Sequence, residues 1–181
     1  MRSLFEKWKT KIPKYSEKHR DIFNVLSQKF GAEGEKKIYL GKHFSTNYEL
    51  YSYAFFLGLY SNEYVPILDG EKKFDFSHHI QYWGSKSGVS TRKDFTCLQE
   101  NMFISLIAKS DIDLLALEKD ELSEEDAVKA LIQTMESYTN GGLILIKEKI
   151  EENSNYFLQP TAFLNLILET SAVDGIASSE F

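Results

Sequence analysis

The residues best suited to chemistry are two adjacent histidines, His78 and His79, which follow an aspartate, Asp75. Imidazole rings bind metals and transfer protons near neutral pH. Adjacent side chains point roughly 100° apart on a helix and to opposite faces on a strand, so the two rings cannot readily chelate one ion. Asp75 and His79 are better spaced, but neither His19 nor His43 has a spacing that adds further ligands. We therefore predict no metal and no cofactor.

Two catalytic possibilities remain as hypotheses. Asp75, His79 and Tyr82 would form an active site if the fold brought them into one pocket. Cys97 could act as a nucleophile beside a histidine, but a cysteine next to Leu98 on a helix is more often a small buried side chain. The glycines match neither a phosphate-binding loop nor a dinucleotide fingerprint. We therefore expect a protein that is not an enzyme.

An aromatic pair followed by a polar, cationic loop is the strongest candidate for a binding surface. Tyr82 and Trp83 precede a segment that carries Lys86, Arg92 and Lys93. Such a combination suits stacking on a nucleic-acid base or an anchor in a protein interface. The alternative is that Trp83 belongs to the core and that the segment is an ordinary loop.

The N-terminal segment is basic and amphipathic. Its apolar residues lie at helical spacing and its lysines lie between them: Leu4, Phe5, Trp8 and Ile12, with Lys7, Lys9 and Lys11. A helix there, ended by Pro13, could bind phosphates, lie on an anionic membrane or dock on its own domain. Of the three, we favour docking on the domain, and Lys7, Lys9 and Lys11 remain candidate binding residues.

Composition and charge set broad limits. The chain has 181 residues, of which 43% are hydrophobic and 27% charged, which is typical of a globular protein. Residues 1–20 carry seven Lys or Arg and two Glu, whereas residues 111–181 carry four Lys and fifteen Asp or Glu. A sequence pI near 5.3 does not favour a dedicated duplex-binding protein. A single cysteine, no secretory signal and no transmembrane segment favour the cytoplasm.

Apolar periodicity predicts an all-α fold of about six to seven helices. Thr46 and Glu49 have the spacing of a capping box and open a helix that is apolar nearly all round, in which Gly58 indicates a close helix crossing. A further helix begins at Ser123, and Asn140-Gly141-Gly142 is expected to end it. Residues 1–173 should form a single domain with residues 1–13 docked on it, and residues 174–181 a loose tail.

One segment has strand character instead. Between residues 64 and 76, Val65 and Ile67 alternate with other residues, as do Phe74 and Phe76, on either side of an Asp69-Gly70 turn. This pattern predicts a small β-hairpin that packs on the helical body.

These observations favour a non-catalytic helical protein that binds another macromolecule, most simply a protein, within a cytoplasmic assembly of bacterial type. One alternative is an accessory subunit that binds nucleic acid through the basic N-terminus and the Trp83–Lys93 loop. The other is an enzyme with its site near Asp75, His79 and Tyr82.

Overall fold

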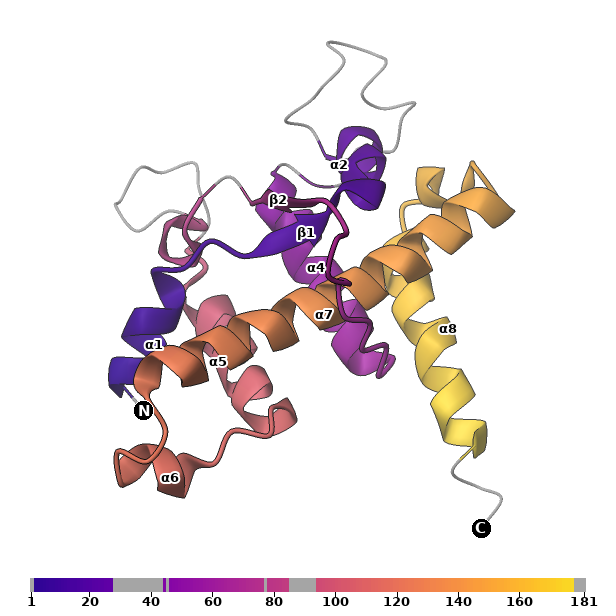
Figure 1. The fold of residues 1–181 in the computed structure, drawn as a ribbon. Coiled ribbons are helices and arrows are strands. Elements are labelled where there is room, and N and C mark those ends of the chain that lie inside the picture. Colours follow the sequence, from indigo (N-terminus) through magenta and orange to yellow (C-terminus); the bar gives the residue numbers. More distant parts are fainter. Residues whose placement is uncertain (1, 28–43, 45, 77, 85–93, 178–181) are drawn as a thin grey trace. The chain divides into compact units, whose positions relative to one another are not determined.

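The structure, a computed structural model, describes residues 2–27, 44, 46–76, 78–84 and 94–177 (Figure 1). Within these ranges it contains seven α-helices and one small two-stranded sheet, which confirms the predicted fold class. The chain divides into two compact units, each built from segments far apart in sequence. The first unit is Met1–Tyr15 and Lys73–Glu136, and the second is Ser16–Lys72 and Ser137–Phe181. That residues 1–173 form a single domain stays a prediction.

The first unit contains most of the sheet and four helical elements. They are α1 (Arg2–Lys9), β1 (Lys14–Ser16, of which Ser16 is assigned to the second unit), β2 (Lys73–Asp75), the 3-10 turn η3 (Ile80–Tyr82), α5 (Thr96–Lys109) and α6 (Leu114–Glu118). The longest helix, α7 (Glu124–Glu152), contributes residues 124–136 to this unit and residues 137–152 to the second.

Aromatic packing holds α1 against α5. Leu4 and Trp8 have no exposed surface. The Phe5 and Trp8 rings lie 5.2 Å and 5.6 Å from the Phe103 ring of α5, between centroids. Buried aromatic rings contribute large apolar areas, so this contact fixes α1 within the first unit. Ile12 lies beyond the end of α1, in the extended segment that leads to β1.

The sheet pairs β1 with β2 in antiparallel register. The Phe76 amide donates to the Pro13 carbonyl at 2.8 Å. The Tyr15 ring then faces the Phe74 ring across the strands, with 6.0 Å between centroids. The N-terminal segment is therefore tied to residues about 60 positions further along the chain.

The predicted strand over residues 73–76 is thus present, but its partner is β1 rather than the segment 64–67. The backbone of Val65 is satisfied elsewhere: its amide donates to the Ser137 carbonyl at 3.2 Å, and its carbonyl accepts from Asn140 Nδ2 at 3.0 Å. Pro66 has no amide hydrogen to give to a sheet. The turn at Gly70, with φ of 90°, connects this segment to β2 without forming a hairpin.

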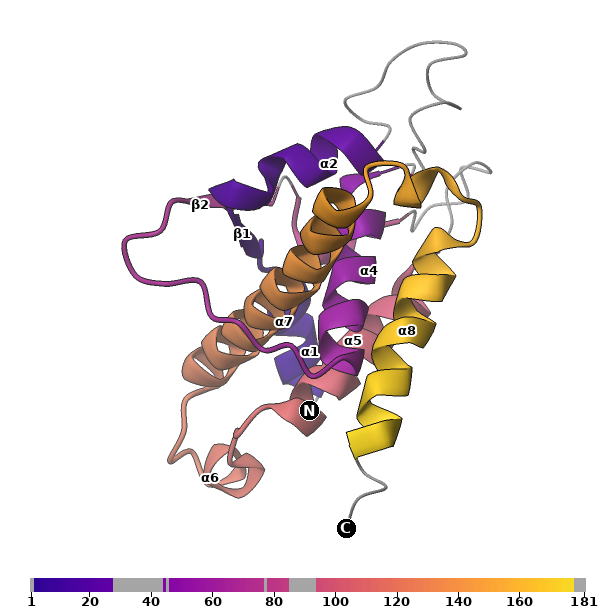
Figure 2. The ribbon, with the colours of Figure 1, turned by 90° about the vertical axis from the view of Figure 1, so that its right-hand side faces the viewer.

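The second unit contains η1 (Glu17–His19), α2 (Arg20–Leu26), α4 (Asn47–Tyr60), the second half of α7, η4 (Tyr156–Leu158) and α8 (Ala162–Ala177). The predicted capping box of α4 is confirmed, because the Glu49 amide donates to Thr46 Oγ1 and the Thr46 amide to Glu49 Oε2. Helix α8 lies beside α4, where Tyr53 Oη donates to the Phe163 carbonyl at 2.7 Å (Figure 2).

The prediction that Asn140-Gly141-Gly142 ends a helix is wrong, because α7 continues through these residues. A Cβ atom on Gly142 would overlap the Ala54 carbonyl of α4, and one on Gly58 would overlap the Tyr138 carbonyl of α7. The glycines therefore permit a close crossing of α4 and α7 rather than a helix end. The close crossing predicted at Gly58 is confirmed.

Helix α8 also extends further than expected. Residues 174–177 were expected to be loose but form its last turn, since no proline interrupts the sequence after Thr170. Residues 178–181 lie outside the described part of the chain.

Candidate functional site: a groove along helix α7

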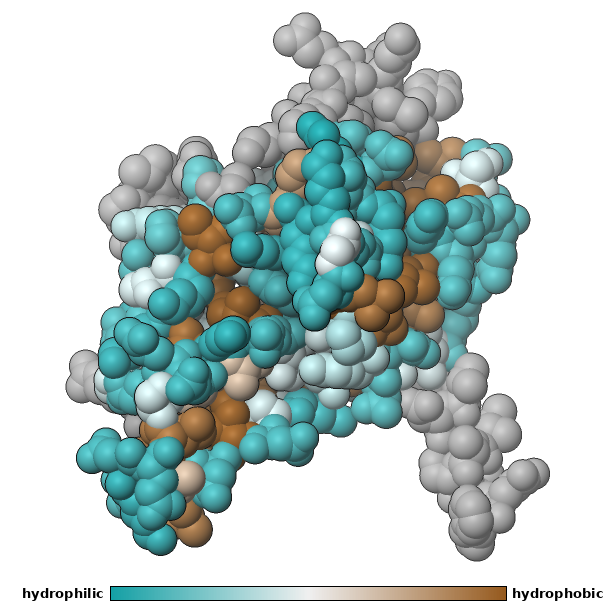
Figure 3. All heavy atoms as spheres, viewed as in Figure 1, coloured by the Kyte–Doolittle hydropathy of each residue, from teal (hydrophilic) through white to brown (hydrophobic). Residues whose placement is uncertain are grey.

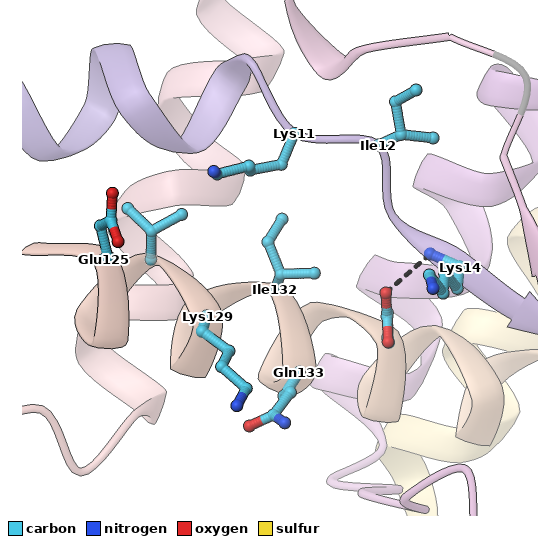
Figure 4. Close-up of a pocket in the computed structure, with 9 residues that line it drawn as sticks. Lys11, Ile12, Lys14, Glu125, Lys129, Ile132 and Gln133 are labelled. Carbon is cyan, nitrogen blue, oxygen red and sulfur yellow. Dashed lines mark hydrogen bonds between the residues drawn. The ribbon is translucent and has the colours of Figure 1, made fainter.

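A groove of about 280 Å³ lies between the N-terminal segment and the first half of α7 (Figure 4). All of its lining residues belong to the first unit. They are Lys11, Ile12, Lys14, Glu125, Val128, Lys129, Ile132, Gln133 and Glu136.

The floor of the groove is aliphatic. Val128 and Ile132 are four residues apart, so they lie on the same face of α7. Val128 is 1% exposed, whereas Ile132 and Ile12 are half-buried. Figure 4 shows Ile132 pointing from α7 toward the segment that carries Lys11 and Ile12. An apolar ligand group can therefore contact this floor from solvent.

The rim of the groove is charged. Lys11, Lys129 and Glu125 are exposed. Within the described residues, neither Lys11 nor Lys129 has a carboxylate within ion-pair distance. Lys14 differs, because its Nζ lies 3.6 Å from Asp75 Oδ1. Two cations of the rim are therefore available to a carboxylate of a ligand.

Glu136 closes one end of the groove. Its Oε1 accepts a hydrogen bond from the Lys14 amide at 2.7 Å, which ties α7 to the start of β1. Burial raises the pKa of Glu136, and the Lys14 amide and the nearby charges of Lys73 and Lys14 oppose that rise. The carboxylate thus caps a backbone amide of β1.

The structure buries Trp83, one of the predicted binding residues. Its side chain is 1% exposed, its Nε1 donates to the His78 carbonyl at 3.2 Å, and its ring packs against Phe76 at 5.6 Å. Gln99 of α5 donates to the Ile80 and Trp83 carbonyls and holds this turn in place. The ring is therefore a core residue and offers no stacking surface, while Tyr82 beside it is 61% exposed.

The predicted cations have different environments. Lys86, Arg92 and Lys93 lie outside the described residues. Lys7 forms an ion pair with Glu124, which raises the pKa of the lysine. Lys9 pairs with Glu6 and lies over the Phe5 ring, 5.1 Å from its centroid. Of the three N-terminal lysines, only Lys11 lines the groove.

The residues of the enzyme hypothesis do not meet in the groove. The His79 ring contacts the Tyr82 ring edge-on at 5.8 Å, and His79 Nδ1 is hydrogen-bonded to the Thr10 carbonyl. Asp75 instead pairs with Lys14. None of Asp75, His79 and Tyr82 lines the groove. The geometry therefore gives no support to a shared pocket for these three side chains.

Cys97 is exposed, which corrects the expectation of a buried thiol. It lies in the first turn of α5, whereas the buried face of that helix begins two residues later, with Gln99 and Met102. The apolar neighbour Leu98 is only half-buried. The sequence pattern placed Cys97 on the wrong side of the helix.

Sequence reasoning missed a buried polar pair in the second unit. His19 is 1% exposed and its Nε2 lies 2.8 Å from Asn140 Oδ1, while Asn140 Nδ2 donates to the Val65 carbonyl. Because the amide of Asn140 is oriented by Val65, His19 Nε2 must be the donor, which leaves Nδ1 buried with no hydrogen-bond partner among the described residues. Burial lowers the pKa of His19 to about 4. The one signal in the sequence was an Asn beside two glycines inside an apolar helix.

The described residues contain no cluster of metal ligands, since no three His, Cys, Asp or Glu side chains among them gather closely enough to hold an ion. None of the helices in the described ranges is both long and apolar enough to cross a bilayer. The chain matches no protein-family model, and no curated protein or solved structure is significantly similar to it.

Proposed function

We propose that this protein is a non-catalytic helical protein that binds another protein within a cytoplasmic assembly of bacterial type. The groove along α7 is the binding site in this proposal. The partner contributes a short segment with an aliphatic side chain for the floor and a carboxylate for the rim. The observation that carries the proposal is an accessible floor of Ile12 and Ile132 beside two lysines, Lys11 and Lys129, that have no ion pair in the described residues.

The size of the groove favours binding of a side chain of the partner over binding of a whole helix or domain. A volume of about 280 Å³ lies at the lower end of the roughly 300 to 1,000 Å³ of ligand pockets, so the groove has room for a small group such as a side chain. Interfaces concentrate their binding energy in a few such anchors, which are surrounded by a polar rim. An aliphatic floor with a lysine rim follows that pattern.

A protein partner fits the groove better than a nucleic acid does. Glu125 and Glu136 line the same groove as the lysines, and a phosphate backbone would be repelled by them. Base stacking needs an accessible aromatic ring, but none of the described residues that line the groove is aromatic. An acidic peptide segment can place its carboxylates near the lysines while its backbone passes the glutamates.

The test compares the full chain with groove variants. Tagged wild-type protein is incubated with extract of its source cells, and captured proteins are identified by mass spectrometry. Ile132→Asp removes the apolar floor, and Lys129→Glu reverses one charge of the rim. Lys109→Glu is the matched control, because it makes the same charge change on α5 at an exposed position outside the groove.

The affinity of the purified partner decides the outcome. We expect calorimetry to show at least tenfold weaker binding for each groove variant and unchanged binding for Lys109→Glu, where tenfold corresponds to about 1.4 kcal/mol. Equal affinity for wild type and both groove variants would refute the groove as the site. A captured nucleic acid with steep salt dependence would favour the accessory-subunit alternative instead.

A further inference from the structure

The short helix α6 is a preformed apolar projection of the first unit. The Asp113 side chain caps it by accepting from the Leu115 and Ala116 amides at 2.9 Å and 3.0 Å. At its other end the Glu121 amide donates back to the Ala116 carbonyl at 2.8 Å. Both ends of this single turn are therefore fixed by hydrogen bonds, which lowers the entropy cost of using it as a binding element.

The surface of α6 combines exposed leucines with carboxylates. Leu114 is 40% exposed and Leu115 is 66% exposed. The acidic residues around them are all exposed: Asp111, Asp113, Glu118, Asp120 and Glu121. Both ribbon views show α6 set apart from the other helices of its unit (Figure 1 and Figure 2). The two adjacent exposed leucines form a small apolar patch with carboxylates around it, and an apolar patch with a polar rim is a candidate contact surface.

The groove and α6 carry groups that can pair with one another. The floor at Ile12 and Ile132 accepts an aliphatic side chain of the kind that Leu115 exposes. The rim carries Glu125 as well, but its two lysines without an ion pair in the described residues, Lys11 and Lys129, can pair with carboxylates of α6. Figure 3 shows hydrophobic atoms at the surface among hydrophilic ones over both α6 and the first half of α7. None of the residues that line the groove comes from α6, so α6 of the same chain does not fill it.

We propose that α6 of one copy of this chain docks in the α7 groove of a second copy, with Leu115 as the apolar anchor. Two such contacts made reciprocally close a two-fold dimer, because each copy carries both the projection and the groove. This inference rests on the proposed function, since it uses the same groove. It names the partner as a second copy of the chain.

Sedimentation velocity of the full chain over a range of concentrations tests the self-association. We expect wild type to change from monomer to dimer as concentration rises. Leu115→Asp should remain monomeric at every concentration at which wild type is dimeric. Leu164→Asp is the matched control, because Leu164 of α8 is also exposed, at 58%, and should leave the dimer unchanged. Wild-type protein that remains monomeric up to about 1 mM overturns the proposal, since a dissociation constant above that value is too weak for a specific dimer.

A peptide identifies the two surfaces that meet. The probe is a fluorescein-labelled peptide with the sequence of residues 111–122, titrated into full-length Leu115→Asp protein, whose groove is intact. We expect saturable binding by anisotropy that weakens at least tenfold when Lys129→Glu or Ile132→Asp is added and is unchanged with Lys109→Glu. Dimerisation that Leu115→Asp leaves intact, or a scrambled peptide that binds equally well, overturns the assignment of α6 to the groove.

The failure of this inference can be told from the failure of the proposed function. Leu115→Asp protein keeps its groove, so it should still bind a different protein partner if the groove serves one. If wild type does not dimerise and Leu115→Asp protein does not bind the peptide, but a cellular partner still binds through Lys129 and Ile132, only the second-copy assignment is wrong. If Lys129→Glu and Ile132→Asp weaken neither the binding of the peptide nor the binding of a cellular partner, both proposals are wrong.

Discussion

The two halves of α7 show how side-chain size decides whether a helix is enclosed or left open. Residues 137–143 are all buried and consist mainly of small or polar side chains, with Gly141 and Gly142 among them. In the first half, Lys129 and Gln133 are exposed and Ile132 is half-buried beside a groove. Where glycines remove the side chains, a neighbouring backbone packs directly on the helix. In the first half, α7 carries longer side chains, so the neighbouring segment of residues 11–14 lies further from the helix backbone and a groove remains.

The enclosed half should be the more sensitive to substitution. Gly142→Ala places a methyl group where the Ala54 carbonyl of α4 lies, and a backbone atom cannot move aside as a flexible side chain does. Because the two helices must separate, we expect a loss of about 3 kcal/mol or more in the free energy of unfolding, measured with urea.

Gly70→Ala is the matched control for this prediction. Nothing lies within 4 Å of the position of its Cβ, so the same substitution there adds only the strain of a residue with φ of 90°. We expect a loss of about 1 to 2 kcal/mol. If Gly142→Ala cost no more than Gly70→Ala, α4 and α7 would not cross in backbone contact.

The enclosed half should also make stability depend on pH through His19. Its pKa is lowered from 6.5 to about 4 in the folded state, so the folded protein binds fewer protons than the unfolded chain between these values. The stabilisation is complete above about pH 6.5 and is lost as pH falls toward 4, by about 3 kcal/mol in all.

His19→Gln isolates this effect, because the glutamine amide can donate to Asn140 Oδ1 but does not titrate. The free energy of unfolding is measured for each protein at about pH 7.5 and at about pH 4. Its decrease between these two pH values should be larger for wild type than for the variant by about 3 kcal/mol. Equal decreases in the two proteins would show that His19 is not held neutral by burial.

In the open half, Glu136 provides a smaller effect of the opposite sign. Burial raises its pKa, so its contribution to stability is present below the unfolded value of about 4.5 and is lost as pH rises through the folded value. Glu136→Gln keeps an oxygen for the Lys14 amide and removes the charge. We expect the variant to match wild type at about pH 3.5 and to be more stable than wild type at pH 7. A variant less stable than wild type at pH 7 would mean that the charge itself is needed.

The same contrast explains what the sequence could and could not predict. Period-3.6 apolar faces and the Thr46–Glu49 box were enough to predict a helical fold and the start of α4, because those signals are local. Asn140-Gly141-Gly142 reads locally as a helix end, but its meaning comes from α4, about 85 positions earlier. Gly58 was interpreted correctly because a glycine destabilises the interior of a helix unless a neighbouring backbone packs closely against it.

The candidate site was harder to predict for the same reason. Lys11 was identified from the basic N-terminal segment, but Ile132, Lys129 and Glu136 were not. The contact that ties this segment to α7, the Lys14 amide on Glu136, joins residues about 120 positions apart. Trp83, by contrast, was predicted as a binding residue but belongs to the core. An aromatic residue before a polar loop is compatible with either a surface anchor or a core position. Its indole contact with the His78 carbonyl, which decides between them, has no signature in the sequence.

The smallest predicted effect is on the stability of the open half itself. Lys129 is exposed and has no ion pair in the described residues, so Lys129→Glu removes no ion pair among them. The new carboxylate lies four residues from Glu125, and like charges at that spacing cost about 0.2 to 0.5 kcal/mol on a helix. For a chain of this size we expect the melting temperature to fall by no more than about 2 °C, measured by circular dichroism beside wild type and Lys109→Glu. A fall comparable to that of Gly142→Ala would show that the first half of α7 is packed as tightly as the second, in which case the groove is not open to a ligand. A small fall means that lost binding in this variant reports on the groove and not on unfolding.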